Sequence, residues 1–203
     1  DIASNMVPAV DTAIYSAVGT DTVSHGVVRS AQDTGNLGYK MAMDGGVTVS
    51  VEAARNTAAG GTDNTYGITY TGFDGMTLAA GVGSTATGGA AEVESKTYGV
   101  KYATGGFTFG VQLTDVEFEG TTEDEDGVHM GVTYNVNDDF TIGYVRQETD
   151  FSGNSSDEEH SGIQASYSMG SISFSGRVSK VDNMGGSASA SDEDKHITMS
   201  IAF

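Results

Sequence analysis

The feature that most constrains this chain is an alternation of apolar and polar side chains that recurs from residue 36 to the C-terminus. In the last eight residues, His196–Phe203, every second side chain is apolar and the intervening ones are polar or small. A period of two is that of a β-strand, whose successive side chains point to opposite faces of a sheet. Many soluble sheets end on such a strand, so the weight of the pattern comes from its recurrence.

Eleven segments carry the pattern and are predicted to be strands. They are 36–43, 47–55, 64–71, 76–83, 95–103, 107–117, 127–136, 140–149, 161–168, 171–181 and 195–203. Tight connections rich in Gly, Asp and Asn, which favour hairpin turns, alternate with longer polar ones. Short connections on one side and long ones on the other are typical of an all-β, antiparallel up-and-down transmembrane β-barrel.

Three hairpins also share a sequence template, in Tyr66–Tyr70, Tyr98–Tyr102 and Met130–Tyr134, whose copies are spaced by 32 residues. Such a period also suits a solenoid of stacked repeats. A solenoid repeats one turn geometry, whereas the connections here vary in length and charge on one side only. The variation favours the barrel.

One face of the predicted strands is bulky and apolar, and the other is small and polar. A soluble β-sandwich would also satisfy this pattern by packing two apolar faces together. The aromatic residues decide between them, because many lie beside the short turns: Tyr70, Phe73, Tyr102, Phe107, Tyr134, Phe140, Tyr167 and Phe203. Aromatics gathered at one end match the interfacial girdle of a membrane barrel. We therefore expect the apolar face to contact lipid and the polar face to line a closed cylinder.

Composition excludes several classes of function. The formal net charge is −19, from 28 acidic and 9 basic residues, which argues against nucleic-acid binding because phosphates would be repelled. The chain has no Cys, so it has no disulfide scaffold, thiol nucleophile or Cys-ligated metal. No apolar run approaches the length of a membrane helix, although a barrel strand needs only every second residue to be apolar. No GxSxG motif is present, and we expect no enzymatic activity.

The segment Asn36–Tyr39 leading to Gly46–Val49, the alternating turn and loop lengths, and the terminal Phe203 resemble those of Gram-negative general diffusion porins, of the trimeric 16-stranded type. The resemblance covers 36–203 well and the preceding residues loosely, and Ile201 departs from it, because the family often has an aromatic there. It implies a homotrimer in the bacterial outer membrane, in contact with lipid and lipopolysaccharide. Each protomer would form a water-filled channel for passive diffusion of small hydrophilic solutes and ions. A structural or surface-adhesive barrel with a closed lumen is the alternative.

The strand count bears on domain organisation, because bacterial barrels close with even numbers of strands and eleven is odd. In the resembled family, a long loop after the fifth strand folds into the lumen, and eleven strands follow it. Residues 1–35, with apolar residues at helical spacing, would be that constriction loop with a short helix, and 36–203 would be strands of a larger porin. The alternative is a complete 12-stranded barrel that uses His25–Gln32 as its first strand.

The polar face supplies the candidate site. Its ionisable residues, together with residues of the expected constriction loop, are predicted to line the pore and to set a transverse field. They are Lys40, Glu52, Lys101, His129 and Arg177 on the strands and Asp11, Asp21 and Arg29 on the loop. The excess of acidic residues predicts a mild preference for cations.

Three acidic clusters fall in the predicted long loops, at Glu123–Asp126, Asp157–Glu159 and Asp192–Asp194. Carboxylate oxygens are calcium ligands, so Glu123, Asp124, Glu125 and Asp126 could hold loop-bound calcium that bridges lipopolysaccharide. The other interpretation is solvated loop charge, which we favour because the Gly-spaced calcium-loop motif is missing. No other cofactor is expected.

Overall fold

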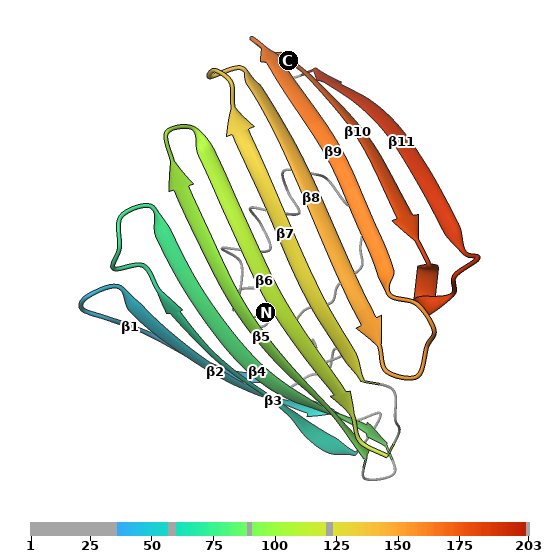
Figure 1. Cartoon of the computed structure of the whole chain (residues 1–203). Helices are drawn as coiled ribbons and strands as arrows, with labels where there is room; N and C mark the ends of the chain where they lie inside the picture. Colours follow the sequence, from blue (N-terminus) through green and yellow to red (C-terminus); the bar gives the residue numbers. More distant parts are fainter. Residues whose placement is uncertain (1–35, 57–59, 89–90, 121–123, 202–203) are drawn as a thin grey trace.

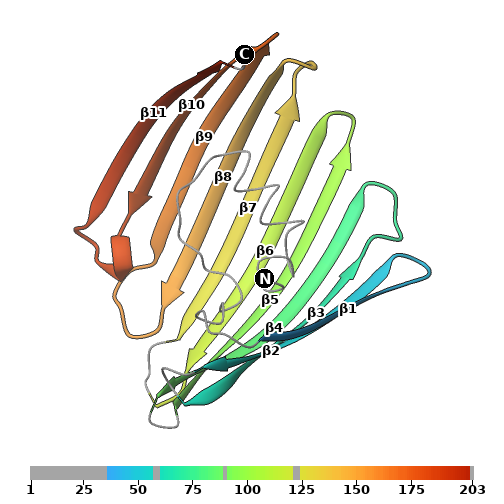
Figure 2. The same ribbon diagram turned by 180° about the vertical axis from the view of Figure 1, so that it is seen from behind.

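The computed structural model describes residues 36–56, 60–88, 91–120 and 124–201, which form one antiparallel sheet of eleven strands in sequence order. The strands are β1 (Asn36–Met43), β2 (Val47–Asn56), β3 (Gly61–Tyr70), β4 (Met76–Gly88), β5 (Ala91–Thr104), β6 (Phe107–Phe118), β7 (Glu125–Asn135), β8 (Phe140–Phe151), β9 (Glu158–Met169), β10 (Ile172–Asp182) and β11 (Ser191–Ile201). Figures 1 and 2 show them side by side in a strongly curved trough. The predicted all-β, up-and-down topology is confirmed.

The predicted constriction loop at 1–35, the possible first strand His25–Gln32 and the terminal Phe203 lie outside the described residues. Within the described part of the chain, no helix is long and apolar enough to cross a membrane.

The short turns form where the sequence provides glycine in the left-handed region. Gly45, Gly46, Gly75, Gly105, Gly106 and Gly170 all have positive φ. Neighbouring turns are joined by backbone hydrogen bonds, as where Ala103 N donates to Gly75 O at 2.7 Å. At Gly75 a Cβ would also collide with Ala103 O, so that turn requires glycine for both its φ and its close approach.

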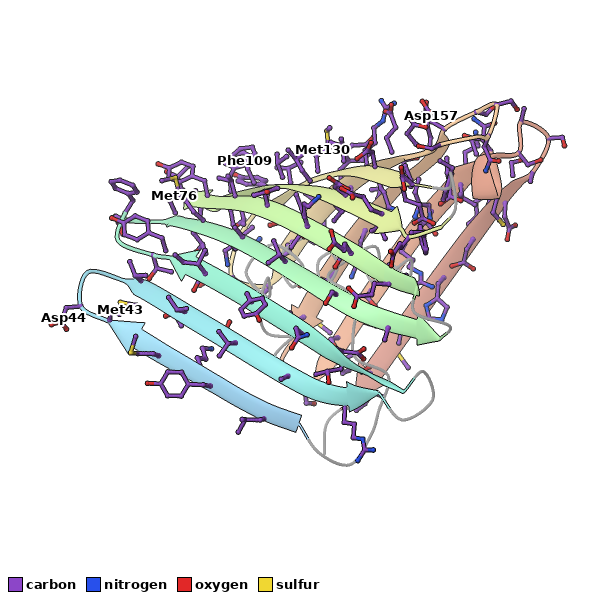
Figure 3. All side chains as sticks on the ribbon, turned by 90° about the horizontal axis from the view of Figure 1, so that it is seen from below. Met43, Asp44, Met76, Phe109, Met130 and Asp157 are labelled. Atoms are coloured by element: carbon purple, nitrogen blue, oxygen red, sulfur yellow. The ribbon has the colours of Figure 1, made fainter. Side chains whose placement is uncertain are left out.

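The convex outer face of the sheet is apolar and exposed. Ile163 is 61% exposed, Tyr98 53% and Val100 44%, and Figure 3 shows Phe109 and Met130 on this side. Near the short turns the aromatic rings pair, with Phe107 stacked on Tyr134 at a centroid separation of 4.2 Å. The expected outward direction of the apolar residues is confirmed, and the rings form the expected band at the turn end.

The concave inner face is small and polar. Its buried side chains are mainly hydroxyls, amides and carboxylates, among them Thr97, Gln112 and Gln147. Gly67, Gly81, Gly99 and Gly110 alternate with them along the strands. No element of the described residues provides a dry core of the kind that a sandwich needs, so the sandwich interpretation fails.

Most strands extend further toward the long connections than the alternation predicted. β4 runs to Gly88 instead of residue 83, and β5 begins at Ala91 instead of residue 95. The acidic clusters were therefore wrongly assigned to loops: Glu125 and Asp126 are in β7, Glu158 and Glu159 in β9, and Asp192–Asp194 in β11. The backbone ladder continues there because it does not depend on side-chain polarity.

Two of the long connections are fastened to one another. Between β10 and β11, a single 3-10 turn, η1 (Met184–Gly186), follows Asn183. Asn154, in the connection between β8 and β9, donates from Nδ2 to Gly185 O at 3.0 Å, and Gly185 N donates to Glu158 Oε2 at 2.7 Å. These bonds fix the loop rim over β8–β11.

Candidate functional site on the inner wall

Among the described residues, the lysines and arginines of the inner face are Lys40 on β1, Lys101 on β5 and Arg177 on β10. The residues beside them in the strands, such as Val100 and Val178, point outward and are 44% and 45% exposed. A charged side chain at the level of an exposed apolar band is stable only where it meets water or a partner inside the barrel. The inner wall is therefore wet or internally paired at this level.

Arg177 belongs to a polar row across the last three strands. Strand register pairs it directly with Gln164 on β9 and with His196 on β11. The Arg177 guanidinium binds Asp194 Oδ2, through Nη2 at 3.2 Å and Nε at 3.3 Å. Thr198 Oγ1 lies 3.1 Å from His196 Nδ1. The ion pair is held by two adjacent strands and is oriented by the sheet itself.

A second part of the inner face, centred on β6–β8, is closely packed. His129 is 1% exposed and its Nε2 lies 3.4 Å from Thr114 Oγ1. Gly127, on the same face, leaves the space for this contact, because a Cβ there would collide with Thr114 Oγ1. The buried polar atoms are mostly paired, but Gln112 Oε1 on β6 and Gln164 Oε1 have no hydrogen-bond partner.

The predicted pore-lining residues divide into three groups. Lys40, Lys101 and Arg177 lie on the inner face and retain solvent exposure. Glu52 and His129 also lie on that face, but they are only 8% and 1% exposed, so neither presents an open side chain to a lumen. The three loop residues Asp11, Asp21 and Arg29 lie outside the described residues.

Sequence reasoning missed several inner-face residues. Asp194 and Glu158 were placed in loops, and Gln164 was noted as polar without a role. The alternation already gives their direction once the strands are extended, since Asp194 has the same parity as His196. Their partners follow only from the register between strands.

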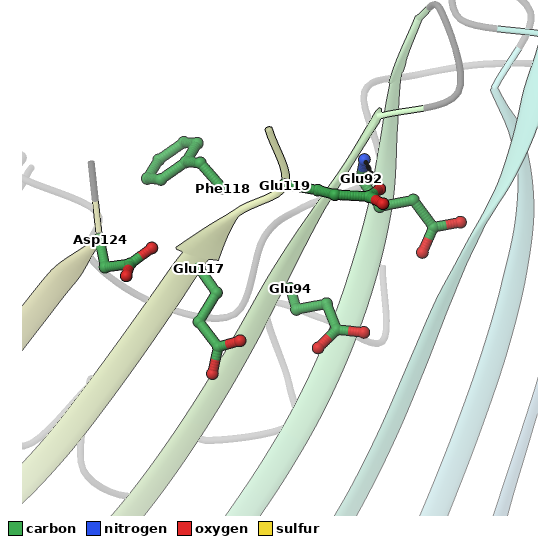
Figure 4. A pocket seen from close by; sticks show the side chains of 6 residues that line it. All are labelled: Glu92, Glu94, Glu117, Phe118, Glu119 and Asp124. Atoms are coloured by element: carbon green, nitrogen blue, oxygen red, sulfur yellow. Dashed lines mark hydrogen bonds between the residues drawn. The ribbon is translucent and has the colours of Figure 1, made fainter. Parts of the chain in front are cut away.

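An acidic rim caps the outer face of β5–β7 at the long-loop end. Glu92, Glu94, Glu117, Glu119 and Asp124 line a hollow of about 360 Å³ together with Phe118 (Figure 4). Lys96 binds Glu117 and lies 3.8 Å from Asp115 Oδ2, and these contacts raise its pKa. The rim marks the level at which the outer face changes from apolar to charged.

Asp126, on β7, lies where the rim is most crowded. Register pairs it with Asp115 on β6 and with Asp150 on β8. Partial desolvation, then repulsion from Asp115 and Asp150, raises the pKa of its carboxyl. The loop calcium predicted at Glu123–Asp126 stays a prediction: Glu123 is outside the described residues, and no group of three possible metal ligands converges in the described part.

A curved antiparallel sheet with an exposed apolar outer face, an aromatic band and a polar charged inner face defines the wall of an outer-membrane β-barrel of the porin class. The family model described as Gram-negative porin matches residues 3–186. The chain belongs to this family and is a protein of the bacterial outer membrane.

Solved structures give the same fold. An anion-selective porin from Comamonas acidovorans matches with a TM-score of 0.61 at 16% identity, over 72% of this chain and 48% of its own. A refined porin structure matches with a TM-score of 0.68 at 17% identity, over 82% of this chain and 60% of its own. OmpT, an outer membrane protein of Vibrio cholerae, has a TM-score of 0.56 at 17% identity, over 81% and 61%.

This chain therefore spans about half to three fifths of the length of the porin chains that it matches. No curated protein sequence matches it.

Proposed function

We propose that this protein forms a water-filled channel through which small hydrophilic solutes and ions cross the outer membrane by passive diffusion. Its role is non-catalytic: the wall offers a polar surface and charges that select solutes, and no covalent chemistry is involved.

The observation that carries this proposal is the contrast between the two faces of the sheet. Ionisable side chains such as Lys101 and Arg177 point inward, while their strand neighbours Val100 and Val178 point outward and are exposed. Outward apolar side chains suit lipid, and inward charges suit water in a lumen. A lumen filled with protein would instead need an apolar inner face or a complete set of polar partners.

A channel requires a closed sheet, and both edges of the described sheet are open. β1 and β11 are the end strands of the described sheet, and each pairs with one neighbour. Unpaired strand edges are not tolerated in the hydrocarbon layer, because their backbone groups would lack hydrogen bonds. We propose that further strands of the intact protein pair with β1 and β11, as expected for a 16-stranded barrel.

Planar-bilayer recording tests the proposal. The intact protein, added to a bilayer, should produce discrete ohmic conductance steps, and liposomes that contain it should swell in small sugars. Folded protein that inserts but gives no step above background would contradict the channel and favour a structural or adhesive barrel with a closed lumen.

We also propose a mild cation preference. Among the described residues, carboxylates outnumber bases on the inner face: Glu52, Asp63, Glu125, Glu158, Asp192 and Asp194 against Lys40, Lys101 and Arg177. Charge at the wall of a narrow pore raises the local concentration of the opposite ion. The reversal potential in a salt gradient measures this preference, and an anion-selective potential would contradict it.

The expected assembly is a homotrimer surrounded by lipid and lipopolysaccharide. The support is family membership together with the exposed apolar outer face, which must be covered by lipid or by another protomer. Seminative electrophoresis should give a heat-sensitive band at three times the protomer mass. A protomer-sized band that remains folded under mild detergent would contradict the trimer.

A further inference from the structure

The inner wall holds an ion pair at the edge of the apolar band, where the outward strand neighbours of Asp194 are the charged residues Glu193 and Lys195. Arg177 and Asp194 are joined at 3.2 Å, yet their side chains remain 23% and 55% exposed. The row that contains Arg177 lies between outward residues Ile163, Val178 and Ile197, which are 61%, 45% and 86% exposed. Ionisable groups beside an apolar band are costly unless they meet water or a partner, and these two face the lumen.

The neighbours of the pair add hydrogen-bonding capacity. Gln164 lies directly opposite Arg177, and its Oε1 has no hydrogen-bond partner. His196 lies opposite Arg177 on the other side, and Thr198 contacts its Nδ1. Gln164 Oε1 is itself buried and out of reach of a solute. The groups of this row that a solute can meet are therefore the guanidinium, the carboxylate and the exposed His196 ring.

We propose that Arg177, Asp194 and His196 form a binding subsite on the pore wall that selects small zwitterionic solutes, the chemical class of free amino acids. The subsite deepens the channel function proposed above and rests on it. The solute carboxylate meets the Arg177 guanidinium, and the solute ammonium meets the Asp194 carboxylate.

The charge arrangement selects this class over simple ions. A paired guanidinium and carboxylate cancel beyond a few ångströms, so they neither concentrate anions nor repel cations at long range. At short range they present one positive and one negative group side by side. Both known contacts use Asp194 Oδ2, which leaves Oδ1 outside those two contacts. A solute with both charges on adjacent atoms matches both groups at once, and a neutral isomer matches neither.

Liposome swelling with the intact protein tests the subsite. The two solutes are L-alanine, a zwitterion, and its uncharged isomer lactamide, which has the same atoms. We expect R177Q and D194N each to lower the ratio of alanine to lactamide permeation by about two- to threefold, the range of exposed charge contacts. High salt should also lower the ratio of alanine to lactamide permeation in the wild-type protein, because screening weakens exposed ion pairs.

Lys180 provides the matched control. It lies on the same strand as Arg177 but faces outward, where it pairs with Asp182. K180Q removes the same charge from the other face and should leave the ratio unchanged. Permeation of lactamide reports whether each variant forms an open pore, and the two single variants test the subsite independently.

Three results would overturn the inference. An unchanged ratio in both variants would show that the pair does not meet the solute. An equal change for both solutes would assign the effect to pore width. Absence of swelling by the wild-type protein with either solute would overturn the channel function and the subsite with it, whereas the first two results leave the channel function standing.

Discussion

At the scale of single residues, the inner wall depends on glycines, which leave room for neighbouring side chains. Gly127 lies on β7 between the wall positions of Thr114 and His129, and a Cβ there would lie 3.0 Å from His129 Nε2 and closer still to Thr114 Oγ1. Thr114 is 6% exposed and β-branched, so it has little room to rotate away. The glycine therefore makes possible a polar contact within the wall.

Gly127→Ala should destabilise the folded barrel by about 1–3 kcal/mol, the usual cost of overpacking a filled site. Urea unfolding in liposomes, followed by heat-modifiable mobility, measures the loss. Adding Thr114→Ala removes the colliding hydroxyl, and the double variant should recover part of the stability. Equal losses in the single and double variants would contradict the collision.

The loop rim gives a paired test of the same kind. Gly185 and Gly186 both have positive φ, 62° and 73°, so Ala at either position costs about 1 kcal/mol of backbone strain. A Cβ on Gly185 meets nothing within 4 Å, but one on Gly186 would lie 2.5 Å from Asn154 Nδ2. Gly186→Ala should therefore release the Asn154 contact, and Gly185→Ala should not.

Limited proteolysis of the folded protein measures the difference. We expect faster cleavage in the connections around Asn154 and η1 for Gly186→Ala, while the barrel remains heat-modifiable. Equal cleavage of the two variants would mean that backbone strain alone controls the loop.

At the scale of the strands, sequence periodicity located the short-turn ends well and the long-loop ends poorly. β4, β6 and β8 begin at the predicted Met76, Phe107 and Phe140. There one face meets apolar surroundings, and alternation is visible. Beyond the apolar band the outer face becomes polar, as at Glu92 and Glu94 on β5, so the apolar alternation is lost while the backbone ladder continues.

Sequence periodicity was also limited in what it could predict about the candidate site. The inward direction of Lys101 and Arg177 could be predicted from parity alone, because it needs only the period of a strand. The Arg177–Asp194 pair could not, because it depends on how β10 and β11 are aligned. The burial of Glu52 and His129 could not be predicted either, because it depends on tertiary structure and not on local sequence.

The extended strand ends bring like charges together. Asp126 lies opposite Asp115 and Asp150 in the strand register, and partial desolvation, followed by repulsion from these two carboxylates, raises the pKa of its carboxyl. The protonated form is therefore favoured in the folded state, so the unfavourable crowding is absent below the unfolded pKa and develops as pH rises through the folded pKa. Asp126→Asn should stabilise the barrel at neutral pH by about 0.2–1 kcal/mol, as for other cross-strand charge pairs.

Urea unfolding at neutral and acidic pH measures this effect. The gain should shrink when the carboxyls are protonated and when salt screens them. Lys96→Gln is the control and should lower the stability of the barrel at neutral pH, because Lys96 binds Glu117 and neighbours Asp115. A gain from Asp126→Asn that is the same at both pH values would exclude charge as its cause.

At the scale of the whole molecule, the distribution of polarity is inverted relative to a soluble protein. In the described part of the chain, the largest fully buried side chains are His129, Thr97 and Thr149, whereas large apolar side chains such as Ile68 and Val111 are 47% and 46% exposed. In water, such an outer surface would drive aggregation. In lipid, it is the stabilising surface, and the polar inner face is tolerated only because it faces away from the acyl chains.

Adjacent residues Val100 and Lys101 test this inversion without changing composition. Val100 points outward between Leu78 and Val111, and Lys101 points inward between Thr77 and Gly110. The exchange Val100→Lys with Lys101→Val puts the charge among lipid-facing side chains, which costs about 2–4 kcal/mol near the bilayer midplane. We expect the double variant to insert poorly into liposomes, as measured by the fraction that migrates as folded barrel.

Lys101→Val alone should fold like the wild type, because a lumen wall accepts an apolar side chain more readily than lipid accepts a charge. Normal insertion of the exchanged protein would mean that the convex face does not meet lipid, and the channel orientation would have to be reversed.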